Sequence, residues 1–364
     1  MPLHILHVFP QFAFGGAQLR SVILMAELGA RYHHTIVSIG GNYAAAEMIP
    51  SSVKHTLFGA LDNSGSLGAR LLRYRRVIEV SAPDVLATYN WGAIEWAIAN
   101  LGGVGHAHHE DGFGPQEAER QISRRVWTRR LVLSGSQVVA PSRTLADIAT
   151  RVWRLNPKHV RHIPNGMAAQ DKFDSSIEDL GLNLPPDLPR VVWVGGLRVE
   201  KNLPRMLRAF APHREKAVLL IIGDGTERAP TEAEIERLGL AGKVHLLGQR
   251  TDARDLVMQC DVLALSSDTE QMPLVVMEAM DAGLTVVSTD VGDVADMVCE
   301  ENRPFITPLT DSALSEALGR VLSDAPLRER IGQANRTRQR DTYALHRMVR
   351  SYDELFSGLA HKTE

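Results

Sequence analysis

Two glutamates, Glu270 and Glu278, are separated by seven residues in the segment SSDTEQMPLVVMEAMDAGLTVV. Pro273 suits the first turn of a helix and Gly283 a C-terminal cap, so a helix is predicted over residues 273–282. Glu270 then lies in the loop before this helix and Glu278 about one and a half turns inside it, which separates the carboxylates by roughly 10 Å or more. That distance is long for the acid and nucleophile of a glycosidase. It suits two ends of one extended ligand.

Paired glycines follow two other predicted strands. Gly15 and Gly16 stand between a strand and a helix, where backbone N–H groups can approach a phosphate closely, with an ordinary tight turn as the alternative. Gly223 and Gly225 open the loop GDGTER after a buried strand, but no third glycine follows. The GxGxxG fingerprint of dinucleotide-binding enzymes is therefore absent, which disfavours a nicotinamide-dependent dehydrogenase.

A histidine cluster, GHAHHEDGFG, contains His106, His108, His109, Glu110 and Asp111 at the end of a predicted strand. Neighbouring residues on a strand point to opposite faces, so His106 and His108 share a side with Glu110, while His109 shares a side with Asp111. This spacing is poor for a metal site, and no metal is expected.

Two stretches are strongly basic, Arg70 to Val77 and Glu119 to Leu133. The second predicts a helix with an apolar core face and a cationic exposed face, formed respectively by Ile122, Val126, Trp127 and Leu131 and by Arg120, Arg124, Arg125, Arg129 and Arg130. Such a face could attract an anionic membrane surface or a lipid-diphosphate acceptor, and an ordinary solvated helix face is the alternative. Nucleic acid is not expected as a partner, because the net charge is minus 3 and no aromatic-plus-basic module is present.

Short β-branched runs alternate with amphipathic helical patterns along all 364 residues, which predicts an α/β fold with parallel sheets. In such sheets ligands bind outside the carboxyl ends of the strands. We expect an N-terminal domain over residues 1–167, a linker over 168–189, a second domain over 190–340, and a C-terminal helix over 341–364 that returns to the first domain. The proline-rich run from Asp174 to Arg190 suggests the linker, since proline breaks both helices and ladders.

Composition separates the two halves. Residues 1–165 hold 17 Lys and Arg against 11 Asp and Glu, and the remainder holds 23 against 32.

The N-terminus is typical of a first strand rather than a signal peptide, and no apolar run reaches the length of a membrane span. The two cysteines suit a reducing cytoplasm, which is the expected location, with peripheral attachment at the inner face of the membrane through the basic helices as an option.

Five segments in this order resemble one enzyme family: GGAQ at 15–18, IPNGM at 163–167, VGGLRVEKN at 194–202, IIGDGTER at 221–228 and TDVGDV at 289–294. With the two glutamates, they are similar to the retaining GT-B glycosyltransferases of family 4, also called group 1, and to their E-x7-E motif. The resemblance implies two doubly wound Rossmann-like domains facing each other across a cleft.

The resemblance also implies roles for individual residues. Glu278 would bind the ribose hydroxyls of a nucleotide sugar, Lys201 its diphosphate, and Glu270 the transferring sugar. Gly196 stands where the family has arginine, and Arg198 could supply that charge; Gln271 stands where the family usually has glycine. His109, or else His108, would contact the sugar from the first domain. The implied catalytic pair is His109 and Glu270, and the implied donor-binding set is Gly15, Gly16, Arg198, Lys201, Gly223, Gly225, Gln271, Met272, Pro273, Leu274 and Glu278.

The expected activity is transfer of a sugar, with retained anomeric configuration, from a nucleoside-diphosphate sugar to a hydroxyl acceptor in bacterial polysaccharide or glycolipid assembly. The acceptor would be a saccharide or a lipid-linked one, and no cofactor or metal is required. A two-lobed nucleotide-sugar-binding protein without catalysis is the alternative, and a nicotinamide-dependent oxidoreductase is a more remote one.

Overall fold

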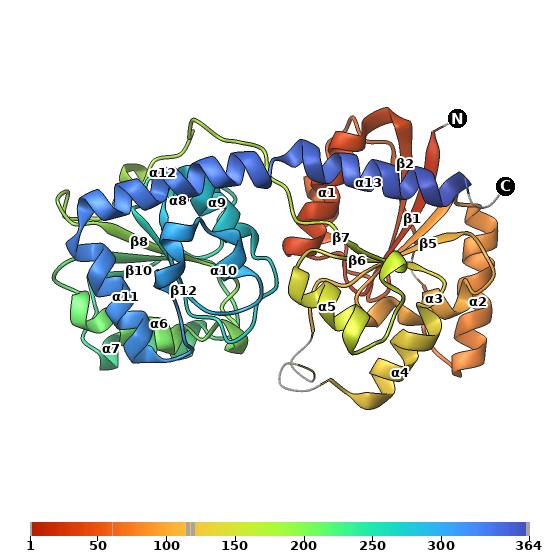
Figure 1. Cartoon of the computed structure of the whole chain (residues 1–364), viewed down its shortest axis with the longest axis horizontal. Coiled ribbons are helices and arrows are strands. Elements are labelled where there is room, and N and C mark those ends of the chain that lie inside the picture. Colours follow the sequence, from red (N-terminus) through yellow and green to blue (C-terminus); the bar gives the residue numbers. More distant parts are fainter. Residues whose placement is uncertain (1, 60, 114–116, 118–120, 362–364) are drawn as a thin grey trace. The chain divides into compact units, whose positions relative to one another are not determined.

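Two parallel β-sheets, one of seven strands and one of six, organise the part of the chain that the structure describes. This computed structural model describes residues 2–59, 61–113, 117 and 121–361. By its internal contacts the chain divides into two units, unit 1 with residues 1–166 and 345–364, and unit 2 with residues 167–344. In each unit helices cover both faces of the sheet (Figure 1).

The sheet of unit 1 has the strand order β3-β2-β1-β4-β5-β6-β7, and its adjacent strands pair in parallel. These strands are β1 (Leu3–Phe9), β2 (Tyr32–Ser38), β3 (His55–Leu57), β4 (Val85–Tyr89), β5 (Gly105–His109), β6 (Gln137–Ala140) and β7 (Val160–His162). The helices of unit 1 are α1 (Gly16–Leu28), α2 (Leu67–Ser81), α3 (Ile94–Ala99), α4 (Ser123–Val132), α5 (Arg143–Arg151) and α13 (Leu345–Ala360).

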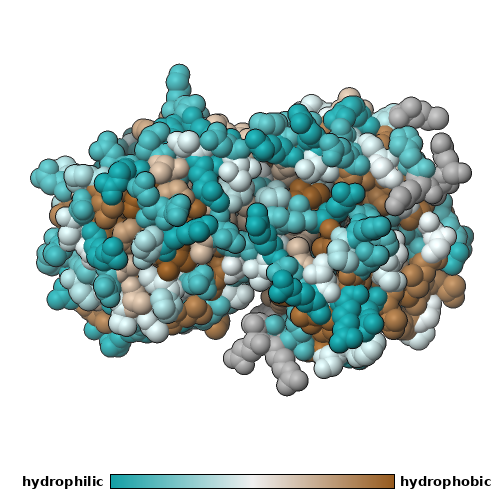
Figure 2. Space-filling view, viewed as in Figure 1, coloured by the Kyte–Doolittle hydropathy of each residue, from teal (hydrophilic) through white to brown (hydrophobic). Residues whose placement is uncertain are grey.

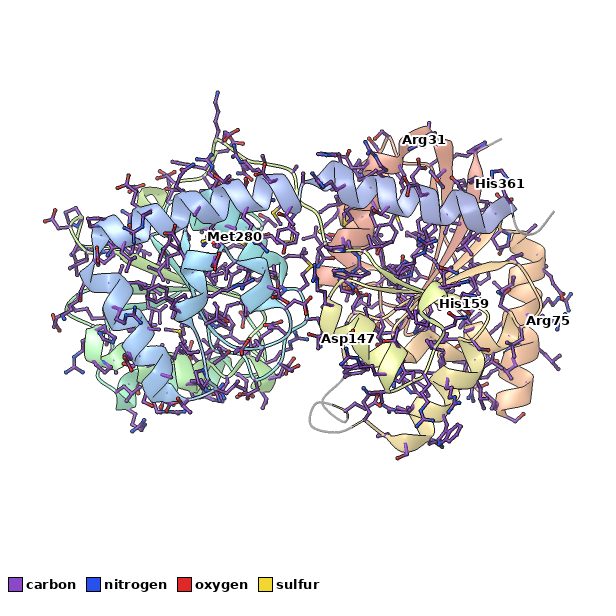
Figure 3. All side chains as sticks on the ribbon, viewed as in Figure 1. Arg31, Arg75, Asp147, His159, Met280 and His361 are labelled. Carbon is purple, nitrogen blue, oxygen red and sulfur yellow. The ribbon has the colours of Figure 1, made fainter. Side chains whose placement is uncertain are left out.

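Helices α1 and α13 pack on one face of this sheet, where Met25 and Tyr352 join a core with Ile5 and Phe9. Helices α2 and α3 cover the other face (Figure 1). Polar contacts also hold the C-terminal helix to this unit. Asp353 of α13 accepts hydrogen bonds from Arg31 (2.7 Å, labelled in Figure 3) and from the Tyr32 hydroxyl (2.6 Å).

The sheet of unit 2 has the strand order β10-β9-β8-β11-β12-β13, again parallel throughout. Its strands are β8 (Arg190–Val194), β9 (Val218–Ile222), β10 (Val244–Leu246), β11 (Val262–Leu265), β12 (Thr285–Thr289) and β13 (Ile306–Thr307). Its helices are α6 (Leu203–Phe210), α7 (Arg228–Arg237), α8 (Ala253–Val257), α9 (Leu274–Ala282), α10 (Val294–Met297), α11 (Asp311–Ser323) and α12 (Ala325–Thr342).

The central strands of unit 2 are apolar at successive positions because both faces of the sheet are buried. Trp193 and Ile221 point into a core made with α6 and α11, while Val192 and Leu220 point into a second core made with α8 and α9. Met280 of α9, labelled in Figure 3, is fully buried in the second core.

The segment 168–189, predicted as a linker, instead packs against unit 2. Ile177 is 1% exposed and joins the core with α8 and α9, together with Leu180, Leu182 and Leu184. Apolar residues spaced between the prolines therefore anchor this stretch, and the chain passes between the units at residues 166–167 and 344–345.

The basic helix predicted within Glu119 to Leu133 begins only at Ser123, and residues 118–120, including Arg120, lie outside the described part of the chain. Val126 packs against a core and Arg124 is exposed, as predicted, but the predicted orientation is wrong at Trp127, Leu131 and Arg129. Trp127 and Leu131 are 58% and 68% exposed, whereas Arg129 is 1% exposed. Arg129 is buried because loops distant in sequence supply it with counter-charges and aromatic rings, namely Glu110, Glu117, Trp91, Phe113 and Trp153.

Candidate active site

The strand order of unit 2 reverses between β8 and β11. The loops that follow the carboxyl ends of these two strands carry predicted site residues. From β8 the chain first adds β9 and β10 on one side and then crosses to place β11 on the other. Ligands of doubly wound sheets bind at such a switch point. Lys201 lies in the loop after β8 and Glu270 in the loop after β11.

The structure brings Lys201 and Glu270 into direct contact. The Lys201 ammonium donates to Glu270 Oε1 at 2.5 Å, and the Ser267 hydroxyl donates to the same oxygen at 2.7 Å. The two side chains are only 16% and 11% exposed. This partly buried ion pair joins a cation and a carboxylate, both of which were predicted to contact one donor molecule.

Several residues that sequence reasoning missed tie these two loops together. Asn202 has a left-handed backbone (φ 48°) and caps α6 by accepting from the Arg205 amide, while its own side-chain amide donates to Asp268 at 3.1 Å. Arg205 donates to the Ser266 carbonyl at 2.8 Å and to Asp268 Oδ1 at 2.6 Å. The asparagine directly before a helix was a usable signal, because asparagine is favoured both as an N-cap and in left-handed backbone.

Gly292 fixes the loop that holds Glu270, Gln271 and Met272. It has a φ of 56°, and a Cβ at this position would overlap the carbonyl oxygens of Glu270 and Gln271. The next residue, Asp293, donates its amide to the Gln271 carbonyl at 2.8 Å. The TDVGDV segment thus acts on backbone geometry, and whether the amides of Gln271 and Met272 contact a donor stays a prediction.

Glu278 lies on α9, which begins at Leu274 with Pro273 at its N-cap and ends at Gly283 in the left-handed conformation (φ 81°), as predicted for that cap. Its side chain is partly buried, and within the described part of the chain it makes no hydrogen bond. Burial raises the pKa of the Glu278 carboxyl, and the positive charge of Arg254 opposes that rise. A carboxylate in this state has acceptor capacity left for a ligand.

Gly223 and Gly225 allow two loops to pack closely. A Cβ on Gly223 would overlap the Gly195 carbonyl oxygen, and one on Gly225 would overlap the Leu197 carbonyl oxygen. Around them Gly195 donates to Ile222 O at 3.0 Å, and Leu197 donates to Asp224 O at 3.0 Å. Both glycines therefore have a packing role, and their contact with a nucleotide-sugar donor stays a prediction.

Arg198 lies on the surface of the same region. Its side chain is 60% exposed and forms an ion pair with Glu200 at 3.0 Å. Gly196, where the family pattern has arginine, is exposed as well, and a Cβ there would lie 3.6 Å from the Arg198 Nε. The Arg198 side chain thus lies against the place where the Cβ of a side chain at position 196 would be.

In unit 1, Gly15 and Gly16 are exposed at the N-terminus of α1, beside the switch point between β1 and β4. One turn into α1, the buried Arg20 forms an ion pair with both carboxylate oxygens of Asp111 and donates to Asn165 at 3.3 Å. Burial by itself would lower the pKa of Arg20, but the charge and hydrogen bonds of Asp111 and the neighbouring Tyr352 and Tyr89 together outweigh burial, and the pKa is raised. Sequence reasoning did not single out Arg20.

The two candidate histidines lie inside unit 1. His109 is 1% exposed and stacks between Tyr89 (4.5 Å between ring centroids) and Tyr352 of α13 (5.7 Å), and burial holds its pKa well below the usual value. His108, 0% exposed, points to the other face, where Thr88 is within hydrogen-bond distance at 2.8 Å. The predicted alternation of faces is thus observed, and a sugar contact by either histidine stays a prediction.

No group of three or more His, Cys, Asp or Glu side chains within the described residues is arranged to hold a metal ion. Over the same residues, no helix combines the length and apolar character needed to cross a bilayer.

Two family models match the chain in succession: residues 14–170 match Glycosyltransferase Family 4, and residues 177–338 match Glycosyl transferases group 1. The chain belongs to this glycosyltransferase family. Its relatives are similar over different lengths. The lipopolysaccharide glucosyltransferase WaaG of Escherichia coli is 23% identical, over 96% of this chain and 97% of that protein. An uncharacterised glycosyltransferase of Methanocaldococcus jannaschii is 28% identical, but over only 54% of this chain and 53% of that protein.

The fold of this glycosyltransferase is also seen in solved relatives. The structure of Anabaena HepE in complex with UDP and glucose superposes with a TM-score of 0.84 at 19% identity, over 98% of this chain and 100% of that one. The two Rossmann-like units of the enzyme are thus those of the GT-B fold, as the sequence predicted.

Proposed function

We propose that this glycosyltransferase moves a sugar from a nucleoside-diphosphate sugar to an acceptor hydroxyl and retains the anomeric configuration. The observation that carries the proposal is Glu278, a partly buried carboxylate without a hydrogen bond in the described chain, on the helix that follows the Lys201–Glu270 pair. A ribose offers two adjacent hydroxyl donors to such a carboxylate. HepE was solved in complexes with UDP and glucose and with UDP-glucose, which supports a uridine nucleotide as the first donor to try.

Lys201 supplies the positive charge that a diphosphate leaving group requires. As the bond between sugar and diphosphate breaks, negative charge develops on the phosphate oxygens, and a preorganised cation stabilises it most when little water is present. In the proposed reaction Lys201 exchanges Glu270 for the diphosphate, and Glu270 turns to the sugar hydroxyls. The acceptor attacks from the face that the leaving phosphate occupied, the phosphate helps to remove the acceptor proton, and no metal is required.

We propose that unit 1 supplies the acceptor side, and that the acceptor belongs to bacterial polysaccharide or glycolipid assembly at the cytoplasmic face of the membrane. Its helices α2 and α4 carry exposed apolar side chains, among them Leu72 (72%), Val80 (78%), Trp127 (58%) and Leu131 (68%). Exposed arginines lie beside them, including Arg76 and Arg124. Figure 2 shows hydrophobic and hydrophilic side chains side by side in this region. Each arginine near an anionic bilayer adds about 1 kcal/mol of attraction.

The transfer is tested with UDP-, GDP- and ADP-sugars. Thermal shift identifies the nucleotide, slow hydrolysis of the donor identifies the sugar, and NMR of the product gives its anomeric configuration. We expect one nucleotide to stabilise the protein and Glu278→Gln to weaken its binding. No stabilisation by any nucleotide would contradict the proposal, and binding without turnover towards any acceptor would favour a non-catalytic nucleotide-sugar-binding protein.

The membrane surface is tested by co-sedimentation with vesicles of phosphatidylglycerol and phosphatidylcholine. The whole chain should sediment with the anionic vesicles, and Trp127→Ser with Leu131→Ser should reduce that fraction. Leu57→Ser, which changes an exposed leucine on β3, is the matched control. Equal sedimentation with neutral and anionic vesicles would remove the electrostatic part of the proposal.

A further inference from the structure

A second carboxylate, Asp281, lies one helical turn beyond Glu278 on α9. It is 2% exposed, and both of its oxygens are engaged. Arg254 of α8 donates to Oδ2 at 2.8 Å, the Gln170 amide donates to the same oxygen at 2.7 Å, and Arg340 of α12 donates to Oδ1 at 3.1 Å. Asp281 thus accepts three hydrogen bonds from protein groups, whereas Glu278 accepts none within the described residues.

Arg254 is fixed from two sides. Its Nη2 donates to Asp281 and also to the Ala168 carbonyl at 2.6 Å. Asp281 and Glu278 are three residues apart on α9 and therefore neighbours on its surface, and the charge of Arg254 acts on the Glu278 carboxyl. Arg254 nevertheless makes no hydrogen bond to Glu278 among the described contacts.

The charges around Glu278 come from three elements. Arg254 faces it from α8, Asp281 lies on its own helix, and Arg340 reaches Asp281 from α12. Burial raises the pKa of Glu278, and Arg254 is the charge that opposes this rise. A carboxylate must be ionised to accept hydrogen bonds from two hydroxyls through both oxygens.

We propose that Arg254 is a positioning residue for the nucleotide: clamped by Asp281 and the Ala168 carbonyl, it provides positive charge beside Glu278 and leaves both Glu278 oxygens free for ligand hydroxyls. This inference rests on the proposed function, in which Glu278 binds the ribose. A direct hydrogen bond from Arg254 to Glu278 would occupy carboxylate oxygens that the ligand hydroxyls need. Asp281 and the Ala168 carbonyl bind Nη2 of Arg254 instead.

The test is the pH dependence of nucleotide affinity, measured by calorimetric titration of the whole chain with UDP, GDP and ADP between about pH 5.5 and pH 8.5. Arg254→Met keeps the length of the side chain and removes its charge. We expect its affinity to be within about twofold of the wild type at the high end and about three- to tenfold weaker at the low end, because Glu278 then protonates at a higher pH. Arg254→Lys, which keeps the charge, should restore most of the wild-type profile.

Two further variants separate this role from a structural one. Arg340→Met removes the other arginine from Asp281, and its pH profile should match that of the wild type. In a Glu278→Gln background the affinity should no longer depend on Arg254, so adding Arg254→Met should change it by less than about twofold.

The outcomes are distinguishable. Failure of all three nucleotides to bind the wild type overturns the proposed function and this inference with it. A nucleotide that binds the wild type and Arg254→Met with the same pH profile, or a loss in Arg254→Met that is equal at all pH values, overturns the inference alone.

Discussion

The Lys201 ammonium lies 2.5 Å from Glu270 Oε1, in a pair that links the carboxyl ends of β8 and β11. Both side chains are mostly buried, so the pair is screened by water less than a surface ion pair would be. In the proposed reaction a phosphate of the donor takes the place of Glu270 on the Lys201 ammonium. Under that proposal the pair holds Lys201 in place before the donor binds, and part of the donor's binding energy would be used in separating Lys201 from Glu270.

Replacing Lys201 by methionine should reduce kcat/KM for the proposed transfer by roughly 10²- to 10³-fold, because one fixed cation at the leaving group is lost. Steady-state kinetics with the best donor gives the value. Arg198→Met, in the same loop but 60% exposed, is the matched control and should cost less than Lys201→Met. Equal losses in the two variants would show that Lys201 has no special place at the diphosphate.

Close backbone contacts predict a second set of effects. Gly223→Ala and Gly292→Ala should each lower the free energy of unfolding by more than about 2–3 kcal/mol, because the new Cβ would overlap a carbonyl oxygen and both glycines have positive φ. Gly196→Ala, whose Cβ would make only an ordinary contact with Arg198, should change it by less than about 1 kcal/mol. Urea unfolding measures all three. A Gly223→Ala variant as stable as Gly196→Ala would mean that the β8 and β9 loops can separate without cost.

Stability should fall as the pH drops below the ordinary pKa of histidine. Burial lowers the pKa of His7 and His109 well below 6.5, and lowers those of His34 and His106 to about 3. The unfolded chain then binds more protons than the folded one between the two values, so stability is complete above about pH 6.5 and declines below it. Each such histidine contributes a slope of about 1.4 kcal/mol per pH unit.

Calorimetric unfolding between about pH 7.5 and pH 5 measures this slope. His106→Gln should reduce it by about one histidine's share, whereas His346→Gln, at an exposed position of α13, should leave it at the wild-type value. If His106→Gln and the wild type had the same slope, His106 would have to be protonated inside the folded protein.

The sequence predicted the strands well, and the side-chain surroundings of the site less well. Continuous apolar runs such as Val218–Ile222 identify strands buried on both faces, and Pro273 and Gly283 mark the helix that carries Glu278. The placement of Lys201 and Glu270 at neighbouring strand ends followed from the parallel topology.

Contacts between segments that are distant in the sequence could not be predicted from local patterns. The charge beside Glu278 comes from Arg254, which local spacing does not relate to it, and His109 is buried by a helix more than 200 residues further along the chain. The packing of the predicted linker was not foreseen, because prolines mark irregular backbone and the leucines between them determine whether that backbone is packed.

Arg129 is the position where periodicity was most misleading, and it gives the last prediction. Its guanidinium lies 4.9–5.4 Å from the centroids of three aromatic rings, and it donates at 3.2 Å to one carboxylate oxygen of Glu110 and to both of Glu117. Arg129→Met removes the cation and leaves the buried Glu110 carboxylate without its arginine, while Glu117 keeps Arg125, so the free energy of unfolding should fall by about 3–5 kcal/mol. Arg129→Lys should recover only part of this, because an ammonium cannot stack on the rings and bridge both carboxylates as the planar guanidinium does. Arg124→Met, at an exposed position of the same helix, should stay within about 0.5 kcal/mol of the wild type in the same urea titration. An Arg129→Met protein as stable as Arg124→Met would show that the buried ion pairs and ring contacts of Arg129 add nothing to stability.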